Sequence, residues 1–328
     1  TSPSNLNVVH LHGLCSSWMR QDKPSLVELF RQDQARVDYI HRQASNATAR
    51  LNPIGNSLFA RVPATINYDI SRYSHIINIG LGIPTKFFSF TFDIGIFDFV
   101  FGCGHDNTGT FGHADGLLGL GRGPLSIINQ TPQLYNKIFS YCLPSRPNTI
   151  GYLELGSSVL GVKYTPMLTK LEMPSYYFLN LIDISIGGER LGLPPTIFSG
   201  PGTMLDSGTA FSHLPPSAYS TLRNIFRNYM RNYTMAPPMF NLDTCYDISN
   251  YPMVLVPEVS LIYDGKVTTK LDSTGILFVF NKSRACFPFT QNKDDSEVVI
   301  IGSMQHLTFS VVYDVGNSQI GFGANGCS

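Results

Sequence analysis

The stretch that decides the fold is LDSGTAFSHLPPSAY, residues 205–219, in which a strand-like run ends at Asp206 and a tight Asp-Ser-Gly-Thr turn follows. A second Asp-x-Gly turn lies upstream, at Asp93-Ile94-Gly95. Each turn is followed later by two apolar residues and a glycine, Leu117-Leu118-Gly119 in the first half and Ile300-Ile301-Gly302 in the second. This internal repeat predicts two related lobes.

The repeated turn is a device for presenting a carboxylate. Glycine lets the backbone turn closely, and a neighbouring Ser or Thr hydroxyl orients the carboxyl. Two such turns facing each other bring two carboxylates together, and because like charges at that range cannot both ionise, the pair shares one proton. One carboxylate then activates a water while the other protonates a substrate carbonyl oxygen. The candidate catalytic residues are Asp93 and Asp206, and the turn residues that support them are Gly95, Ser207, Gly208 and Thr209.

Composition and charge exclude several classes of function. The chain has 328 residues, 43% hydrophobic and 14% charged, which suits two well-buried domains. Lys plus Arg and Asp plus Glu both number 23, so no net field favours nucleic acid or an anionic membrane. Apolar runs are only strand-sized, so no membrane span is expected. The histidines lack metal-ligand spacing and no dinucleotide loop is recognisable, so we expect neither a metal nor an organic cofactor.

The cysteines and glycosylation sequons favour the secretory route. The six cysteines are widely spaced with no CxxC pair, which favours disulfides in an oxidising compartment; they are Cys15, Cys103, Cys142, Cys245, Cys286 and Cys327. Four sequons make Asn46, Asn129, Asn232 and Asn281 glycosylation candidates. Because the first residue is Thr1, we expect a removed signal peptide. The expected location is outside the cell in the apoplast or in the vacuole, with a plastid as an open alternative.

The first 73 residues differ from the rest. Residues 25–42, SLVELFRQDQARVDYIHR, place apolar side chains at helical spacing, and Pro24 stands just before them. This pattern predicts an amphipathic helix. The stretch from Ser45 to Tyr73 is polar, rich in small residues and suited to cleavage, so we expect a linker there.

After residue 74 the sequence is typical of a mostly-β protein. Short β-prone runs alternate with Gly, Pro, Asn and Asp; examples are Ile76 to Ile79, Phe87 to Phe92, Tyr176 to Leu181 and Phe309 to Tyr313. Two further helices are expected, Leu125 to Gln130 after a glycine-rich turn and Pro216 to Tyr229, which begins with proline.

Several long motifs follow one another in order along the chain. They are VVHLHGLCSSW (8–18), RQDQARVDYIHR (31–42), FGCGHDNTGTFGHADGLLGLGRGPLSIINQ (101–130), FSYCLP (139–144), LDSGTAFSHLPPSAY (205–219), LDTCYD (242–247) and VVYDVGNSQIGFGANGC (311–327). In these motifs, over nearly its whole length, the chain resembles the plant nepenthesin-like branch of the pepsin family of aspartic peptidases. Aspartic proteases are themselves the general example of two carboxylates that share one proton.

This resemblance implies a bilobal, mostly-β pepsin-like fold with three parts: a pro-segment at 1–73, an incomplete N-terminal catalytic lobe at 74–159 and a C-terminal catalytic lobe at 160–328. It implies a monomer that cleaves a polypeptide substrate at acidic pH, and a helix that docks on the lobes until acidification releases it. It also implies disulfides Cys245–Cys286 and Cys142–Cys327. The family supplies the usual partner of Cys103 from an interval that is missing here, and Cys15 has no assigned partner.

The first lobe departs from the family pattern in two respects. Its turn reads Asp93-Ile94-Gly95-Ile96, so β-branched hydrocarbon replaces the two hydroxyls of the family's DTGS turn. About 24 residues separate Gly95 from Gly119, whereas about 94 separate Gly208 from Gly302, so roughly 70 residues are missing from the first lobe. In the family that interval holds a β-hairpin flap over the cleft. Loss of the flap predicts impaired catalysis.

Three functions remain open at this point. The leading one is an aspartic endopeptidase that uses Asp93 and Asp206. The second is a non-catalytic binding protein, because the same plant branch resembles xylanase-inhibitor proteins that keep the fold and lose catalysis. The third is a truncated splice product without function. The unaltered DSGT turn at Asp206 favours ancestry as an enzyme, and Ile94 with the missing flap favours the other two.

Overall fold

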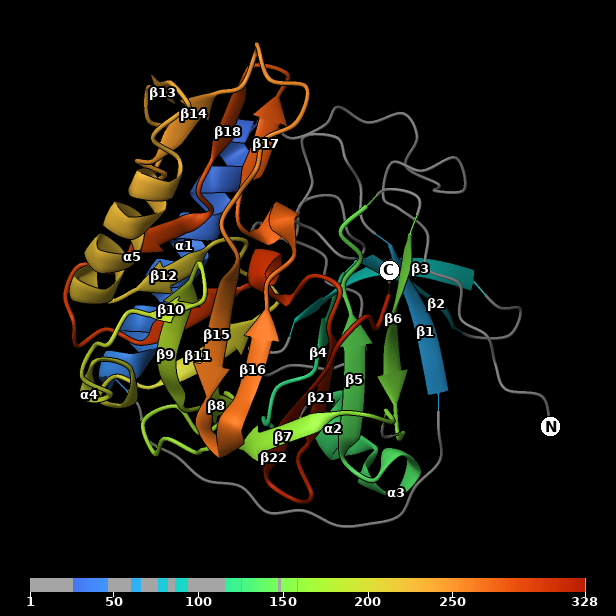
Figure 1. Cartoon of the computed structure of the whole chain (residues 1–328). Coiled ribbons are helices and arrows are strands. Elements are labelled where there is room, and N and C mark those ends of the chain that lie inside the picture. Colours follow the sequence, from blue (N-terminus) through green and yellow to red (C-terminus); the bar gives the residue numbers. More distant parts are fainter. Residues whose placement is uncertain are drawn as a thin grey trace.

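A computed structural model of the chain describes residues 26–46, 60–65, 76–81, 86–93, 116–124, 126–146, 149–157 and 159–327. The described part is mostly β, as predicted (Figure 1). Cys15, Gly95 and Cys103 lie outside these residues, and so does the linker expected at 45–73 apart from residues 45–46 and 60–65. Among the described helices, none is both long and apolar enough to cross a membrane.

A nine-stranded sheet joins the first half of the chain to the C-terminus. Its order is β4-β3-β2-β1-β6-β5-β21-β22-β7. The strands are β1 (Ala60–Thr65), β2 (Ile76–Leu81), β3 (Lys86–Asp93), β4 (Gly116–Gly119), β5 (Ile138–Cys142), β6 (Ile150–Leu155), β7 (Lys163–Pro166), β21 (Ser310–Asp314) and β22 (Gln319–Gly323). The last two strands therefore complete a sheet that the first half begins.

Three smaller sheets form the second half. Their orders are β10-β9-β15-β16, β19-β12-β20-β11-β8 and β13-β14-β18-β17. The strands are β8 (Phe178–Leu179), β9 (Leu181–Ile186), β10 (Glu189–Arg190), β11 (Thr203–Asp206), β12 (Ser212–Leu214), β13 (Met235–Ala236), β14 (Cys245–Asp247), β15 (Val259–Tyr263), β16 (Val267–Lys270), β17 (Phe278–Asn281), β18 (Arg284–Cys286), β19 (Phe289–Gln291) and β20 (Val299–Gly302). The candidate residue Asp206 ends a strand inside the five-stranded sheet.

The helices agree closely with the sequence pattern. They are α1 (Leu26–Asn46), α2 (Ile127–Gln130), α3 (Pro132–Tyr135), α4 (Thr196–Ser199) and α5 (Pro216–Tyr229). The amphipathic helix expected at 25–42 is α1, and α5 has the predicted bounds. Helix α5 begins at Pro216, whose missing N–H is not needed at a helix start. It buries Tyr219, Leu222 and Phe226 on one stripe.

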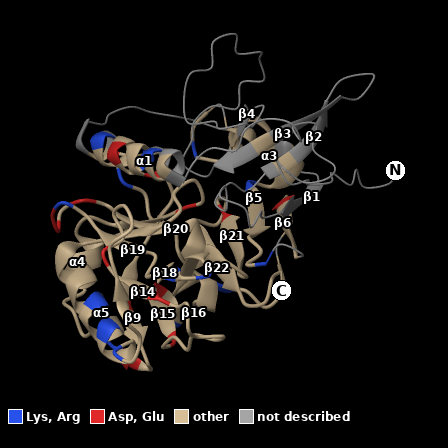
Figure 2. Cartoon of the chain, turned by 90° about the horizontal axis from the view of Figure 1, so that it is seen from above, with Lys and Arg blue, Asp and Glu red and all other residues tan. Residues whose placement is uncertain are grey.

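Helix α1 covers one side of the five-stranded sheet. Val37 and Ile40 are buried in a cluster with Phe178, Met204 and Ile300. Figure 1 shows α1 lying across β11 and β12, and Figure 2 shows α1 and α5 on opposite sides of this sheet. The apolar stripe of α1 is therefore buried against the five-stranded sheet, including β11, the strand that ends at Asp206.

One segment differs from the sequence-based expectation. Residues 60–65, placed in a linker by their small and polar composition, form strand β1, which pairs with β6 from Ala60↔Leu155 to Thr65↔Ile150. Its partner lies about 90 residues ahead in the chain, so no local pattern reveals it.

Two disulfides are present in the described part, Cys142–Cys327 and Cys245–Cys286. Both are the pairings that the family resemblance implies. Cys142–Cys327 ties β5 to the C-terminal segment, and Cys245–Cys286 joins directly opposed residues of β14 and β18. The first holds the two halves together and the second lies within the C-terminal half.

Candidate active site

The two candidate aspartates occupy equivalent places in the two halves. Strand β11 pairs in parallel with β20, and Asp206 lies opposite Gly302. Strand β3 pairs in parallel with β4, and Asp93 lies opposite Gly119. The repeat recognised in the sequence is therefore a structural repeat, a strand that ends in aspartate beside a strand that ends in glycine. For the site at Asp93, the structure describes this pairing of the backbone strands.

Glycine is required at position 302 by close backbone approach. A Cβ atom there would lie 2.6 Å from the carbonyl oxygen of Ala210 and 2.6 Å from the carbonyl carbon of Phe211. The Gly302 N–H donates to Ser212 Oγ at 3.0 Å, and Ser212 Oγ donates to Gln305 Oε1 at 2.6 Å. The segment that follows the Asp206 turn, Ala210 to Ser212, is thus packed against Gly302 at the end of β20.

The Asp206 carboxylate is fully buried and receives hydrogen bonds from its own turn. Thr209 Oγ1 donates to Oδ2 at 2.5 Å, and the Gly208 N–H approaches Oδ1 at 3.4 Å. Ser207 is buried, and its Oγ has no hydrogen-bond partner among the described residues. Within the predicted support set, Thr209 and Gly208 orient the carboxylate directly.

A guanidinium from α1 binds Asp206 in a bidentate manner. Arg36 Nε donates to Oδ2 at 2.6 Å and Nη2 donates to Oδ1 at 2.7 Å. Burial raises the pKa of Asp206, but the Arg36 charge and hydrogen bonds, with those of Thr209 and Gly208, outweigh it and leave the pKa below its usual value. Asp206 is therefore an ionised carboxylate whose two oxygens are both occupied.

A second carboxyl from α1 lies beside the same turn. The Ala210 N–H donates to Asp33 Oδ1 at 2.5 Å, while Asp33 Oδ2 is buried and has no partner in the described part of the chain. Burial raises the pKa of Asp33 to about 7, and the nearby Asp206 charge adds to this effect. At acidic pH Asp33 is a neutral acid within the field of Asp206 and Arg36.

Sequence reasoning did not find Asp33 or Arg36. The signal was available, because both lie on the buried side of α1, between Phe30 and Val37 in a helix otherwise read as an apolar stripe. Charged residues at such positions are rarely buried without a partner. Arg36 binds Asp206, 170 residues away, and Asp33 accepts from the Ala210 N–H, 177 residues away. The helical pattern alone cannot show such distant partners.

The glycosylation candidates differ in whether their asparagine side chains are exposed or already hydrogen-bonded. Asn129 Nδ2 donates to the carbonyl oxygens of Arg122 at 2.7 Å and of Gly123 at 3.0 Å, so its amide is used within a loop. Asn232 and Asn281 are exposed. Asn46 ends α1, and its side chain lies outside what the structure describes.

Comparison with known proteins places the chain in a family. The model described as xylanase inhibitor N-terminal matches residues 87–157, and the model described as xylanase inhibitor C-terminal matches residues 176–324. An aspartyl protease family protein of Arabidopsis thaliana is 33% identical over 419 residues, covering 100% of this chain and 88% of the relative. Aspartic proteinase nepenthesin-2 of Nepenthes gracilis is 32% identical, covering 86% of this chain and 69% of the relative.

The alignment with the Arabidopsis relative also bears on length. It extends over 419 residues whereas this chain has 328, so 91 aligned positions hold no residue of this chain. Solved structures show the same fold: EDGP has a TM-score of 0.67 at 15% identity, covering 84% of this chain and 96% of that one, and soybean basic 7S globulin has 0.65 at 14%, covering 81% and 95%. The chain belongs to the plant aspartic protease family that includes nepenthesin.

Proposed function

We propose that the chain is an aspartic endopeptidase homologue whose acid-pH peptide hydrolysis is impaired. The supporting observation is the repeated strand arrangement, in which Asp93 and Asp206 end equivalent strands opposite Gly119 and Gly302. Asp206 has its turn hydrogen bonds in place, from Thr209 and Gly208. In the proposed reaction one aspartate takes a proton from water, which attacks the scissile carbonyl carbon, while the other donates a proton to the carbonyl oxygen.

The same site explains why activity is expected to be low. A water that bridges two carboxylates needs free oxygen lone pairs, and Arg36 occupies both oxygens of Asp206. The roughly 70 residues missing from the first lobe would remove substrate positioning, which alone costs about a hundredfold or more. Catalysis therefore requires α1 to leave, and it is slow even then.

The domain roles and surroundings belong to the same proposal. We assign residues 1–73 to a pro-segment, 74–159 to a shortened N-terminal catalytic lobe and 160–328 to the C-terminal catalytic lobe. The proposed protein is a monomer of the secretory pathway, acting on polypeptides outside the cell or in the vacuole. Its two disulfides support an oxidising compartment.

An acid-pH assay on a generic protein substrate tests the proposal. The chain should show slow turnover, Arg36→Ala should be faster because it frees the Asp206 carboxylate, and Asp206→Asn should abolish turnover in both backgrounds. A version that carries the missing first-lobe interval should be the fastest. Cleavage that survives Asp206→Asn would refute the assignment, and robust turnover by the unmodified chain would refute the impairment.

The second candidate is a non-catalytic binding protein of the same fold. It is favoured by the bidentate Arg36–Asp206 pair, because a carboxylate that stays bound to an arginine in this way cannot activate a water. The assay separates the two candidates: a binding protein stays inactive in Arg36→Ala and in the version with the restored interval.

A further inference from the structure

An apolar tract lies on the surface of the C-terminal half, from Tyr251 to Val256. Val254 and Val256 are half-buried and pack against the main core. Met253 and Leu255 are each 70% exposed, and Tyr251 is 38% exposed. Burial that alternates in this way is typical of an extended segment with one side turned to solvent. The outward side of this segment is apolar too, and we call Tyr251, Met253 and Leu255 the apolar patch.

Two tyrosine hydroxyls attach the tract to the segment that follows α5. Residues 251–256 lie outside the strands, and the Leu255 N–H donates to Tyr233 Oη at 2.9 Å. Tyr251 Oη donates to the carbonyl oxygen of Asn232 at 3.2 Å. The rings of Tyr233 and Tyr251 lie edge to face, 4.8 Å apart between their centroids. The apolar patch is therefore fixed beside Asn232.

Asn232 can carry a glycan at this place. It begins the sequon Asn232-Tyr233-Thr234, and both Asn232 and Thr234 are exposed. The chain turns there, because the Tyr233 N–H donates to the carbonyl oxygen of Met230 at 2.9 Å, just after α5 ends. An exposed asparagine in a surface turn is an accessible acceptor for a glycan. Since Tyr251 binds the backbone of this same asparagine, the first sugars would begin beside the apolar patch.

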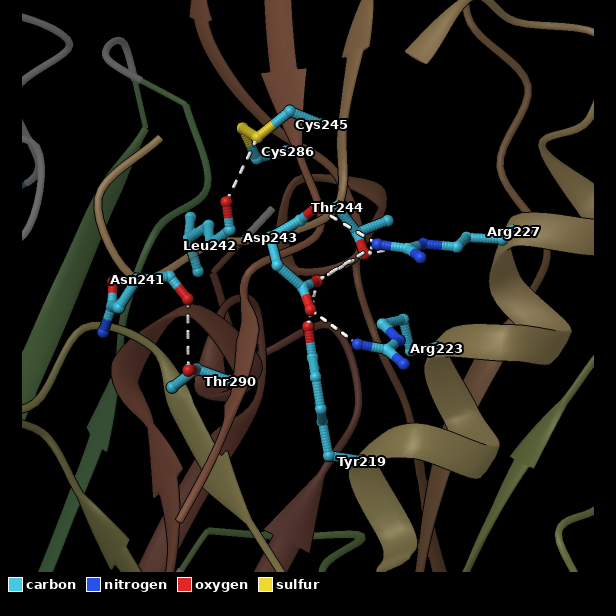
Figure 3. A network of polar contacts seen from close by, with 10 residues as sticks. All are labelled: Tyr219, Arg223, Arg227, Asn241, Leu242, Asp243, Thr244, Cys245, Cys286 and Thr290. Atoms are coloured by element: carbon cyan, nitrogen blue, oxygen red, sulfur yellow. Dashed lines mark hydrogen bonds and ion pairs between the residues drawn. A yellow bond between two sulfur atoms is a disulfide. The ribbon is translucent and has the colours of Figure 1, made fainter. Parts of the chain in front are cut away.

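A polar network holds the sequon and the patch in a fixed relation (Figure 3). The Asp243 carboxylate accepts hydrogen bonds from three side chains, Tyr219 at 2.5 Å, Arg223 at 2.7 Å and Thr244 at 2.6 Å. Arg227 donates to the Asp243 carbonyl oxygen at 3.1 Å. This Asp243 network ties α5, which ends just before the sequon, to the start of β14, which leads to the tract. Neither segment can move far from the other.

We propose that a glycan on Asn232 folds back over the apolar patch, so that the patch is a carbohydrate-binding surface for the chain's own glycan. A pyranose ring has an apolar face of C–H groups, and the negative face of an aromatic ring such as Tyr251 attracts them. The sugar hydroxyls at the ring edge stay in water. Apolar groups gathered on a surface mark an interaction site. A glycan attached beside the patch needs little affinity to cover it, because its effective concentration there is high.

The test uses the full chain secreted from a eukaryotic host that attaches N-linked glycans, with an anilinonaphthalene sulfonate dye as the probe of exposed apolar surface. Asn232→Gln and Thr234→Ala both remove the sequon, and the second keeps the asparagine. Each should raise dye fluorescence by about twofold or more, because the patch is uncovered. Asn281→Gln is the matched control, since Asn281 is an exposed sequon asparagine at the end of β17, and it should leave the fluorescence unchanged.

Substitutions in the patch locate the effect. Met253→Ser combined with Leu255→Ser should return Asn232→Gln to the wild-type fluorescence, and both side chains are exposed enough for the fold to tolerate the change. Enzymatic deglycosylation of folded Asn281→Gln protein should give the same rise as Asn232→Gln, without a glycan lost during folding.

Several outcomes would overturn the inference. They are a secreted protein without a glycan on Asn232, equal fluorescence of Asn232→Gln and Asn281→Gln, no rise on deglycosylation of the folded protein, and a rise that survives the serine substitutions. A wild-type dimer that the serine substitutions dissociate would also overturn it, because the patch would then bind a second copy of the chain. Because no turnover is measured, the result is independent of the acid-pH cleavage assay.

Discussion

Replacing Asp33 by asparagine should remove a pH dependence from the docking of α1. Asp33 is 9% exposed, and its pKa in the docked state is about 7, above the ordinary value of 3.8. The docked state therefore binds a proton that the released helix gives up between these pH values. A group with a raised pKa stabilises fully below pH 3.8, and its contribution is lost as the pH rises through 7. Acidification should tighten α1, the opposite of the release expected from the family resemblance.

The size of the effect follows from the shift. About three pKa units at about 1.4 kcal/mol per unit give an upper value of about 4 kcal/mol, and partial burial of Asp33 in the released ensemble brings the expected change to about 2 to 4 kcal/mol between pH 4 and pH 7. The ion pair does not reverse this sign. The pKa of Asp206 is lowered, so its stabilisation is present above pH 3.8 and is lost only as the pH falls through a still lower value. His213, on β12 beside α1, has its pKa lowered by burial to about 3 and stays neutral in this window.

The measurement is hydrogen exchange of the α1 amides, corrected for intrinsic rates, from pH 4 to pH 8. Wild type should show protection that falls as the pH rises, and Asp33→Asn should show a much shallower profile, whatever its absolute protection. A residual slope is expected because His41 of α1 also lies 3.6 Å from Glu297. Asp38→Asn is the matched control, because Asp38 lies on the same helix with a 35% exposed side chain near Lys293. A wild-type profile in which protection increases with pH, or an unchanged slope in Asp33→Asn, would refute the reasoning.

Three further outcomes are expected. Gly302→Ala should destabilise the fold by more than about 2 kcal/mol in urea titration, because the new Cβ meets backbone atoms at 2.6 Å; a change below about 0.5 kcal/mol would contradict the packing. Asp243→Ala should lose about 1 to 3 kcal/mol of stability by thermal unfolding, since the partners of Asp243 are left unpaired, and an unaltered Tm would argue against the network. Glycopeptide mass spectrometry after secretion should find glycans on Asn232 and Asn281 but none on Asn129, whose amide already makes two hydrogen bonds; a glycan on Asn129 would contradict that loop.

Sequence patterns predicted the structure correctly where the contacts that determine it are close together in the chain. The start of α5 at Pro216 and its apolar stripe are both sequence features, and the helix has the predicted bounds. The Asp-x-Gly repeat was readable because a strand, a tight turn and a glycine partner each have a compositional signature. Its register, Asp206 opposite Gly302, follows the predicted pairing of the motifs.

The features that the sequence did not predict depend on partners far away in the chain. The run from Tyr176 to Leu181 was predicted as one strand, yet it contributes to two, β8 and β9, which belong to different sheets. The break falls at Asn180, whose carbonyl oxygen accepts a hydrogen bond from the Asp264 N–H. Strand β1 and the Arg36–Asp206 pair were missed for the same physical reason, since each depends on a residue far away in the chain.

The position of β21 and β22 in the nine-stranded sheet sets the order in which the protein can be completed during synthesis. Strand β5 pairs with β6 on one side, but its other neighbour, β21, begins about 170 residues later. At typical translation rates the open edge of β5 waits about 10 to 30 s for that partner. Cys142 waits still longer, for Cys327. The first half is therefore exposed to chaperones and to wrong strand partners until the last residues leave the ribosome.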